Sequence, residues 1–197
     1  MPNTGKQRLV IGISGASGVI HGVRLLELIH DLPETHRPET HLVMSHAAEV
    51  TLAHETNFKV SEVHARADVV HANKDIGASI ASGSFRTMGM IIAPCSVKTM
   101  SEVASGVTDT LLSRAADVVL KERRRLVCMV RETPLHSGHL RTMLALSEMG
   151  AIIAPPVAAF YAKPETLENM IDHTLGRVLD LFDLESGTVK RWRDTPA

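Results

Sequence analysis

Short apolar runs alternate with longer amphipathic stretches along most of this chain, and that alternation constrains the fold more than any other feature of the sequence. Five runs are rich in β-branched and aliphatic residues, as is typical of buried strands: 8–14, 40–45, 88–93, 125–130 and 151–154. Strands that alternate with helices predict an α/β fold in which a doubly wound parallel sheet is covered by helices on both faces, giving three layers.

The stretches between the runs carry apolar residues at helical spacing. The expected helices cover residues 19–29, 47–55, 97–104, 109–122, 136–149 and 164–182. Residues 56–84 are polar and mixed, so no regular element is predicted there. A chain of 197 residues is the size of one domain. We therefore expect an N-terminal extension over 1–7, a single α/β domain over 8–184 and a polar tail over 185–197.

Composition excludes several classes of partner. A formal net charge of −1 provides no overall field for nucleic acid or an anionic membrane, and 3% aromatic residues are too few for a base-stacking platform. The apolar runs are too short to span a membrane, and no signal-peptide region opens the chain. With two cysteines in apolar runs, the sequence predicts a cytoplasmic protein without disulfides.

Ligands of doubly wound sheets lie beyond the carboxyl ends of the strands, so the residues that follow each run matter most. The first run is followed by GASG over 15–18, which matches neither the dinucleotide fingerprint nor a P-loop. Ser45 follows the second run and Ser96 the third, and each is suited to an anion site or simply to a helix N-cap. Glu55, at the end of the next helix, is equally suited to a solvated face.

Charged side chains gather in the second half of the chain. Arg131 and Glu132 follow the fourth run, and four cations with one tyrosine would form a phosphate clamp if the fold brings them together: Arg114, Lys121, Arg131, Arg177 and Tyr161. A solvated charged surface is the alternative. His136 and His139 are spaced as metal ligands on a helix, but no third ligand completes a pattern, so we expect no metal.

Nine short motifs, in this order and spacing, make the chain resemble the flavin prenyltransferases of the UbiX type. They are GISGASG (12–18), HLVMS (41–45), ET (55–56), SGSF (82–85), PCSVKT (94–99), SRAADVVLKERR (113–124), RETPL (131–135), PPVAAFY (155–161) and GRVLD (176–180).

The resemblance implies a Rossmann-like, flavodoxin-like fold that assembles as a homododecamer with active sites between subunits. Reduced FMN is bound there as a substrate, and a dimethylallyl group is transferred from dimethylallyl phosphate to flavin N5 and C6. Prenylated FMN then serves a separate UbiD-type decarboxylase, in ubiquinone biosynthesis or in aromatic acid decarboxylation. No metal is implied. A pyrophosphate donor stays open.

The resemblance also assigns site residues, motif by motif. Those expected to bind the flavin are Gly15, Ala16, Ser17, Ser45, Ser82, Ser96, Val97, Lys98, Thr99, Arg114 and Arg131. Those expected to take part in catalysis are Ser17, Glu55, Lys121, Glu132, Tyr161 and Arg177. The resemblance also implies that Glu55 is linked to Ser17. The donor phosphate is expected to meet Lys121, Arg131, Tyr161 and Arg177. Ile76 departs from members that carry an aromatic residue at this position, which leaves the mode of C–O cleavage open.

Three other functions compete with this interpretation. Flavin-dependent cysteine decarboxylases share the GASG segment, but the motif PCSVKT places Lys98 where they carry an asparagine. A non-catalytic flavin carrier would need only the flavin contacts, so the combination of Lys121, Glu132, Tyr161 and Arg177 argues against it. A generic nucleotide oxidoreductase would need the glycine fingerprint that Ser14 interrupts.

Overall fold

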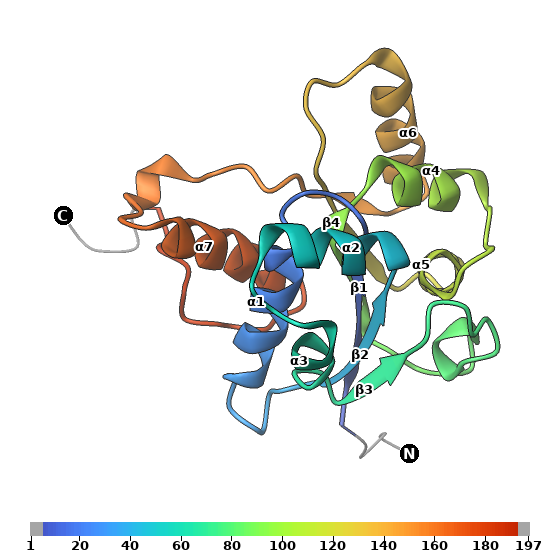
Figure 1. Ribbon diagram of the computed structural model, residues 1–197, viewed down its shortest axis with the longest axis horizontal. Helices are drawn as coiled ribbons and strands as arrows, with labels where there is room; N and C mark the ends of the chain where they lie inside the picture. Colours follow the sequence, from blue (N-terminus) through green and yellow to red (C-terminus); the bar gives the residue numbers. More distant parts are fainter. Residues whose placement is uncertain (1–5, 193–197) are drawn as a thin grey trace.

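A computed structural model describes residues 6–192 and contains one sheet of six parallel strands in the order β3-β2-β1-β4-β5-β6 (Figure 1). The strands are β1 (Arg8–Ile13), β2 (Glu39–Met44), β3 (Val69–His71), β4 (Gly89–Cys95), β5 (Arg125–Val130) and β6 (Ile152–Ile153). Along this order the chain winds outward from β1 to β3, then crosses back to β4 on the other side of β1. The expected doubly wound parallel sheet is confirmed.

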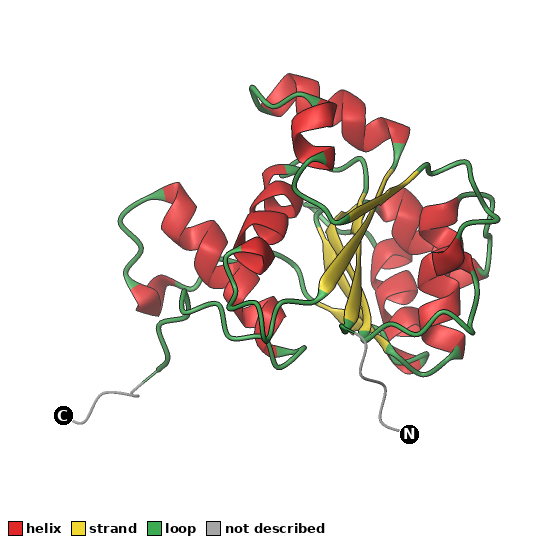
Figure 2. Cartoon of the chain, turned by 90° about the horizontal axis from the view of Figure 1, so that it is seen from below, coloured by secondary structure: helices red, strands yellow, loops and turns green. Residues whose placement is uncertain are grey.

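Helices cover both faces of the sheet, so that the strands form a central layer (Figure 2). The α-helices are α1 (Ile20–His30), α2 (His46–Glu55), α3 (Val60–His64), α4 (Val97–Ser105), α5 (Leu111–Lys121), α6 (Ser137–Glu148) and α7 (Leu167–Asp180). Two 3₁₀ turns, η1 (Ser79–Ala81) and η2 (Phe160–Ala162), lie in the connections.

Each face of the sheet has its own hydrophobic core. Residues of α1, α2, α3 and α7 pack with one set of strand side chains, among them the buried Leu26 and Leu179. Residues of α4, α5 and α6 pack with the other set, among them Met100 and Leu146. This division follows from the strand sequences, because successive side chains of a strand point to opposite faces.

The sequence missed one strand and misjudged the end of another. β3 has only three residues, none of them fully buried, so Val69–His71 gives no apolar run to detect. β4 continues through Pro94 to Cys95, whereas the expected run ends at residue 93, directly before this proline. The pairing with β5 shifts register between Ile92 and Cys95, and at such an irregularity a residue without an N–H group is tolerated.

The sheet order places a topological switch point between β1 and β4, because the connections from these two strands leave toward opposite faces. The segments after β1, β2, β4 and β5 therefore meet at one edge, which we call the carboxyl edge. No helix among residues 6–192 is both long and apolar enough to cross a membrane.

Candidate functional site

Ser14 joins the ends of β1 and β4 at the switch point. Its hydroxyl donates to the carbonyl oxygen of Pro94 at 2.9 Å and accepts from the backbone N–H of Ser96 at 2.8 Å, and the side chain is fully buried. The loop after β1 and the start of α4 are thus fixed to each other through one side chain. The sequence analysis treated Ser14 only as a break in a glycine fingerprint. The signal it missed was a small hydroxyl residue directly after a buried strand.

The turn after β1 is held by the carboxylate at the end of α2. Glu55 Oε2 accepts from the backbone N–H of Gly18 at 2.8 Å and from that of Val19 at 3.3 Å, and Glu55 also accepts from the Ser17 hydroxyl. Residues 37 positions apart in the sequence therefore form one unit. The expected link between Ser17 and Glu55 is present in the fold.

The charge of Glu55 is stabilised by these neighbours. Burial alone would raise the pKa of the Glu55 carboxyl, but hydrogen bonds from Ser17, Gly18 and Val19, with the positive charge of Arg131 nearby, outweigh burial and lower that pKa. Glu55 is consequently a carboxylate at neutral pH. Arg131, which follows β5, is therefore near enough for its charge to stabilise the Glu55 carboxylate.

The glycine at position 15 is required by a close approach between two segments. A Cβ atom built on Gly15 would lie 2.3 Å from the Cβ of Ala47, in the first turn of α2. Any larger residue would push the turn away from α2 and away from Ser45. The expected flavin-binding residues Gly15 and Ser45 are therefore neighbours through Ala47.

Two helices begin at the carboxyl edge and offer amide groups to an anion. Ser45 caps α2 by accepting from the N–H of Ala48 at 3.1 Å, and Ser96 caps α4 by accepting from the N–H of Thr99 at 3.2 Å. The first amides of a helix have no acceptor within the helix, so those of Val97 and Lys98 are suited to a phosphate group. The predicted N-caps and the predicted anion site are compatible at these positions.

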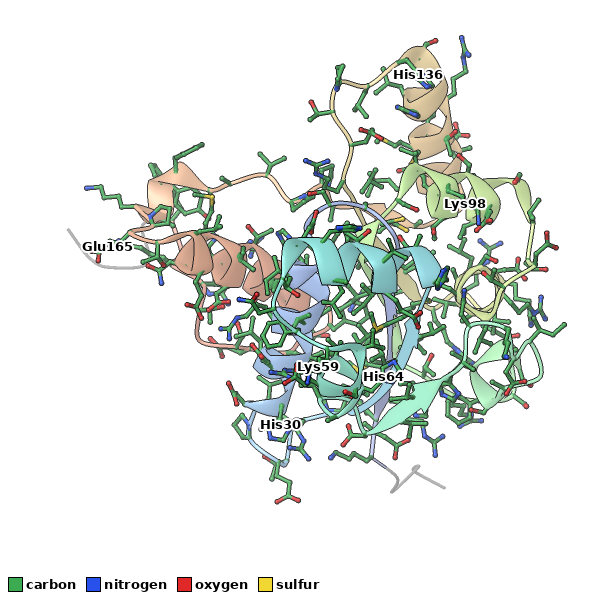
Figure 3. All side chains as sticks on the ribbon, viewed as in Figure 1. His30, Lys59, His64, Lys98, His136 and Glu165 are labelled. Carbon is green, nitrogen blue, oxygen red and sulfur yellow. The ribbon has the colours of Figure 1, made fainter. Side chains whose placement is uncertain are left out.

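The side chains of this helix start differ in exposure. Ser96 and Thr99 are buried and hydrogen-bonded to each other at 3.2 Å. Lys98 is largely exposed on α4, where its ammonium group pairs with Glu102 at 3.0 Å (Figure 3). A phosphate at the start of α4 would meet backbone amides first.

Arg131 and Glu132 follow β5 at the same edge. The backbone N–H of Arg131 donates to the carbonyl oxygen of Cys95 at 3.1 Å, which holds this segment beside the end of β4. The side chain of Arg131 is exposed, and Glu132 is half-buried with its carboxylate accepting from the N–H of Thr133 at 2.9 Å. The edge therefore combines a hydroxyl, two carboxylates and a guanidinium group within reach of solvent.

Three of the expected site residues, Arg114, Lys121 and Ser82, lie on α5 or beside it. Lys121 ends α5, four residues before the start of β5, and pairs with Glu122. A Cβ on Gly83 would lie 2.7 Å from Lys121 Nζ, so the loop that holds Ser82 is beside it. Arg114 lies on the same helix and pairs with Asp117 at 2.6 Å. Lys121 and the loop beside it therefore lie at the amino ends of the strands, roughly a strand length of 20 Å from the carboxyl edge.

Tyr161 and Arg177 form a third group, around α7. The Tyr161 ring lies edge-on to the ring of His173, with centroids 5.6 Å apart. Arg177 lies one turn further along α7 and donates to Asp180 at 2.7 Å. The single chain thus brings Tyr161, from η2, beside the helix that carries Arg177, but the complete five-residue clamp does not form within one chain.

His136 caps the start of α6, and His139 lies in the first turn of that helix. Nδ1 of His136 accepts from the backbone N–H groups of Gly138 and His139, and the two imidazole rings stack with centroids 3.6 Å apart. His136 lies at the tip of α6, away from the body of the molecule (Figure 3). Within residues 6–192, no group of three or more His, Cys, Asp or Glu side chains is placed to hold a metal ion.

Comparison with known proteins gives a consistent set of relatives. The family described as Flavoprotein matches residues 2–192. Flavin prenyltransferase UbiX of Escherichia coli K12 is 57% identical over 189 residues, which cover 95% of this chain and 98% of that protein.

Two solved structures are similar along almost the whole chain. One is AnUbiX (PadA1) in complex with FMN and dimethylallyl pyrophosphate, with a TM-score of 0.92, 48% identity and coverage of 97% of this chain and all of that one. The other is a dodecameric FMN-dependent UbiX-like decarboxylase from Escherichia coli O157:H7, with a TM-score of 0.91, 48% identity and coverage of 95% and 100%.

Proposed function

Because the chain belongs to the UbiX-type flavin prenyltransferases within the Flavoprotein family, we propose that it transfers a dimethylallyl group to FMN and so makes prenylated FMN. The observation that carries the proposal is the cluster of Ser17, Glu55 and Arg131 beside the start of α4, at the switch point where this fold binds ligands. FMN fits there: its phosphate suits the amides at the start of α4, and its ring suits the exposed turn at Ser17.

FMN supplies the nucleophilic N5 and C6 atoms, and the protein supplies the surroundings of the bond that breaks. As C1 of the donor bonds to N5, the C1–O bond breaks and phosphate leaves with the electron pair. Fixed cations at the leaving group stabilise the negative charge that develops there. We assign this role to Lys121, Arg131 and Arg177, with the Tyr161 hydroxyl as a further donor.

Glu132 is suited to move a proton at the end of the reaction. Ring closure breaks the C2–C3 double bond of the prenyl group: C2 gains a proton, C3 bonds to flavin C6, and C6 then loses its own proton. The half-buried carboxylate of Glu132, which accepts from the N–H of Thr133 at the carboxyl edge, would accept the proton from C6. The phosphate that has left is the alternative acceptor. Ser17 and Glu55 position the flavin ring rather than the donor.

The full site needs more than one copy of the chain. Lys121 and Ser82 lie near the amino ends of the strands, remote from the carboxyl edge, whereas the other site residues lie nearer that edge or near α7. We propose that a second copy brings these residues to the flavin and that the assembly is a homododecamer, as in the similar bacterial protein. Exposed apolar side chains on α6 and around η2, such as Leu144 and Phe160, fit such contacts.

Several finer assignments belong to the same proposal. FMN enters in its reduced form, the donor is dimethylallyl phosphate rather than the pyrophosphate, and a UbiD-type decarboxylase receives the product. The cytoplasmic location expected from the sequence stays a prediction.

The proposal is tested without oxygen. The pure protein is mixed with reduced FMN and dimethylallyl phosphate, and the flavin is weighed by mass spectrometry. We expect a flavin heavier by one five-carbon unit, and we expect Lys121→Ala and Arg177→Ala to abolish its formation. Lys59→Ala, which removes an exposed lysine from the start of α3, serves as the control and should leave the yield unchanged. FMN of unchanged mass, with flavin bound and the donor intact, would overturn the proposal.

A further inference from the structure

The C-terminal segment lies along α7 instead of extending into solvent. The Thr188 hydroxyl donates to the carbonyl oxygen of Asp172 at 2.9 Å, and Nε2 of His173 donates to the carbonyl oxygen of Lys190 at 3.3 Å. Gly176 allows the close approach, because a Cβ there would lie 2.5 Å from Thr188 Oγ1. We call residues 186–192 the C-terminal strap.

The last two residues of the strap reach both side chains of the α7 group. The Trp192 ring packs edge-on against the ring of Tyr161, with centroids 5.5 Å apart, so that Tyr161 lies between Trp192 and His173. Arg191 forms two hydrogen bonds of 3.0 Å with the two carboxylate oxygens of Asp180. The same carboxylate accepts from Arg177 at 2.7 Å.

We propose that the C-terminal strap positions Tyr161 and Arg177 for the phosphate of the prenyl donor, with Asp180 and His173 as positioning residues. The inference rests on the proposed function, because it takes these two residues as donor ligands. Through Trp192 and His173 the strap fixes the Tyr161 ring. Through Arg191 it fixes the carboxylate that orients Arg177.

The geometry allows Arg177 to pair with Asp180 and to bind the donor phosphate at the same time. A guanidinium group has five N–H donors, and the bond to Asp180 uses Nη1. The side chain is 54% exposed, so its remaining donors face solvent from which a phosphate can approach. Burial would raise the pKa of Asp180, but Arg191 and Arg177 lower it further than burial raises it, and Asp180 stays charged as an anchor.

The test compares three single variants of the strap. Arg191→Ala removes both bonds to Asp180, and we expect the KM for dimethylallyl phosphate to rise about 10- to 100-fold, as for other losses of positioning. The dissociation constant of FMN should not change. Arg191→Lys should recover part of the loss, because an ammonium group keeps the charge but cannot make the paired bonds. Lys190→Ala is the matched control, since it removes a neighbouring charge and leaves the backbone carbonyl that His173 uses.

A second measurement reports on the strap without turnover. The chain has one tyrosine and one tryptophan, and these are the two rings in contact. While the strap is in place, excitation energy absorbed by Tyr161 is therefore transferred to Trp192, and the fluorescence comes from the tryptophan. In the full-length protein without added flavin, Arg191→Ala and Asp180→Asn should restore tyrosine emission, and Lys190→Ala should not.

The outcomes separate this inference from the proposed function. A native protein that makes no prenylated flavin contradicts the proposed function, which is measured first. If the native protein is active and Arg191→Ala has the native KM for the donor, the positioning role is wrong. A rise in KM that Lys190→Ala shows equally would also overturn it, because the effect would then follow charge and not the bond to Asp180.

Discussion

Glu55 shows how one side chain can organise a binding turn. Its carboxylate takes two backbone N–H groups and one hydroxyl from the turn after β1, although it belongs to the far end of α2. Those N–H groups stand at the start of α1, where a helix has no acceptors of its own. Without Glu55, the turn at Ser17 and Gly18 loses its link to α2.

Replacing Glu55 by alanine should therefore weaken FMN binding. We expect Glu55→Ala to raise the dissociation constant of FMN about tenfold, because losing a charged acceptor of backbone N–H groups commonly costs more than 1 kcal/mol. Quenching of flavin fluorescence on binding measures the constant. Glu49→Ala, at the other end of the same helix, is the control. Equal affinity in the native protein and in Glu55→Ala would contradict this role for the carboxylate.

The same residue predicts how FMN binding depends on pH. The pKa of Glu55 is lower in the folded protein than in the unfolded chain, so its contribution to the stability of the fold, and with it of the turn at Ser17, is complete above the ordinary glutamate pKa of about 4.3. It is lost as the pH falls through the lowered value. We expect Glu55→Gln to reduce the acid loss of FMN affinity, in titrations restricted to conditions where both proteins stay folded. If Glu55→Gln lost FMN affinity at low pH just as the native protein does, the loss would belong to another titrating group.

At the scale of the elements, the site depends on how two strand ends are joined. Ser14 is fully buried and makes one bond as donor and one as acceptor across the β1–β4 switch point. Removing its hydroxyl leaves the N–H of Ser96 and the carbonyl of Pro94 without that partner. Because Ser96 starts α4, a change at Ser14 is transmitted to the proposed phosphate site.

Ser14→Ala should lower the free energy of unfolding by about 1 to 3 kcal/mol, the usual cost of a buried polar group left unpaired. Urea denaturation followed by circular dichroism measures this change. Ser101→Ala, on the exposed side of α4, should be neutral. If Ser14→Ala were as stable as the native protein, the hydroxyl would be replaceable and the switch point would be held by its backbone bonds alone.

The elements differ in how well the sequence reveals them. β5 was predicted residue for residue, because the exposed Arg125 is followed by a continuous apolar run, Leu126 to Val130, that is buried between helical layers. β3 was not predicted, because its place in the sheet comes from pairing with β2 and not from its own hydrophobicity. The Glu55 contact could be assigned only through resemblance, since a carboxylate at a helix end carries no local sign of a partner 37 residues away.

At the scale of the whole molecule, the expected site residues fall into separate regions. The turn at Ser17 lies at the carboxyl edge and Lys121 lies near the amino ends of the strands, a separation set by the direction of α5. The sequence could predict which residues follow strands, but a clamp drawn from several elements depends on how copies of the chain meet. That contact leaves no periodic pattern in a single sequence.

Activity should therefore depend on protein concentration. We expect turnover per chain to fall once dilution separates the copies, because a single chain holds Lys121 away from the proposed flavin site. Mass photometry gives the assembly state at each concentration, and flavin mass spectrometry gives the yield. Constant turnover per chain across a range in which the protein becomes monomeric would show that one copy suffices.

The separation of Ser17 from Lys121 also has a genetic consequence. An allele encoding Ser17→Ala damages one end of the sheet, and an allele encoding Lys121→Ala damages the other. In a cell that expresses both, some contacts between copies join the intact edge of one chain to the intact lysine of another. We expect these two recessive lesions to complement each other within a single gene, whereas Ser17→Ala and Glu55→Ala, which share one edge, should not.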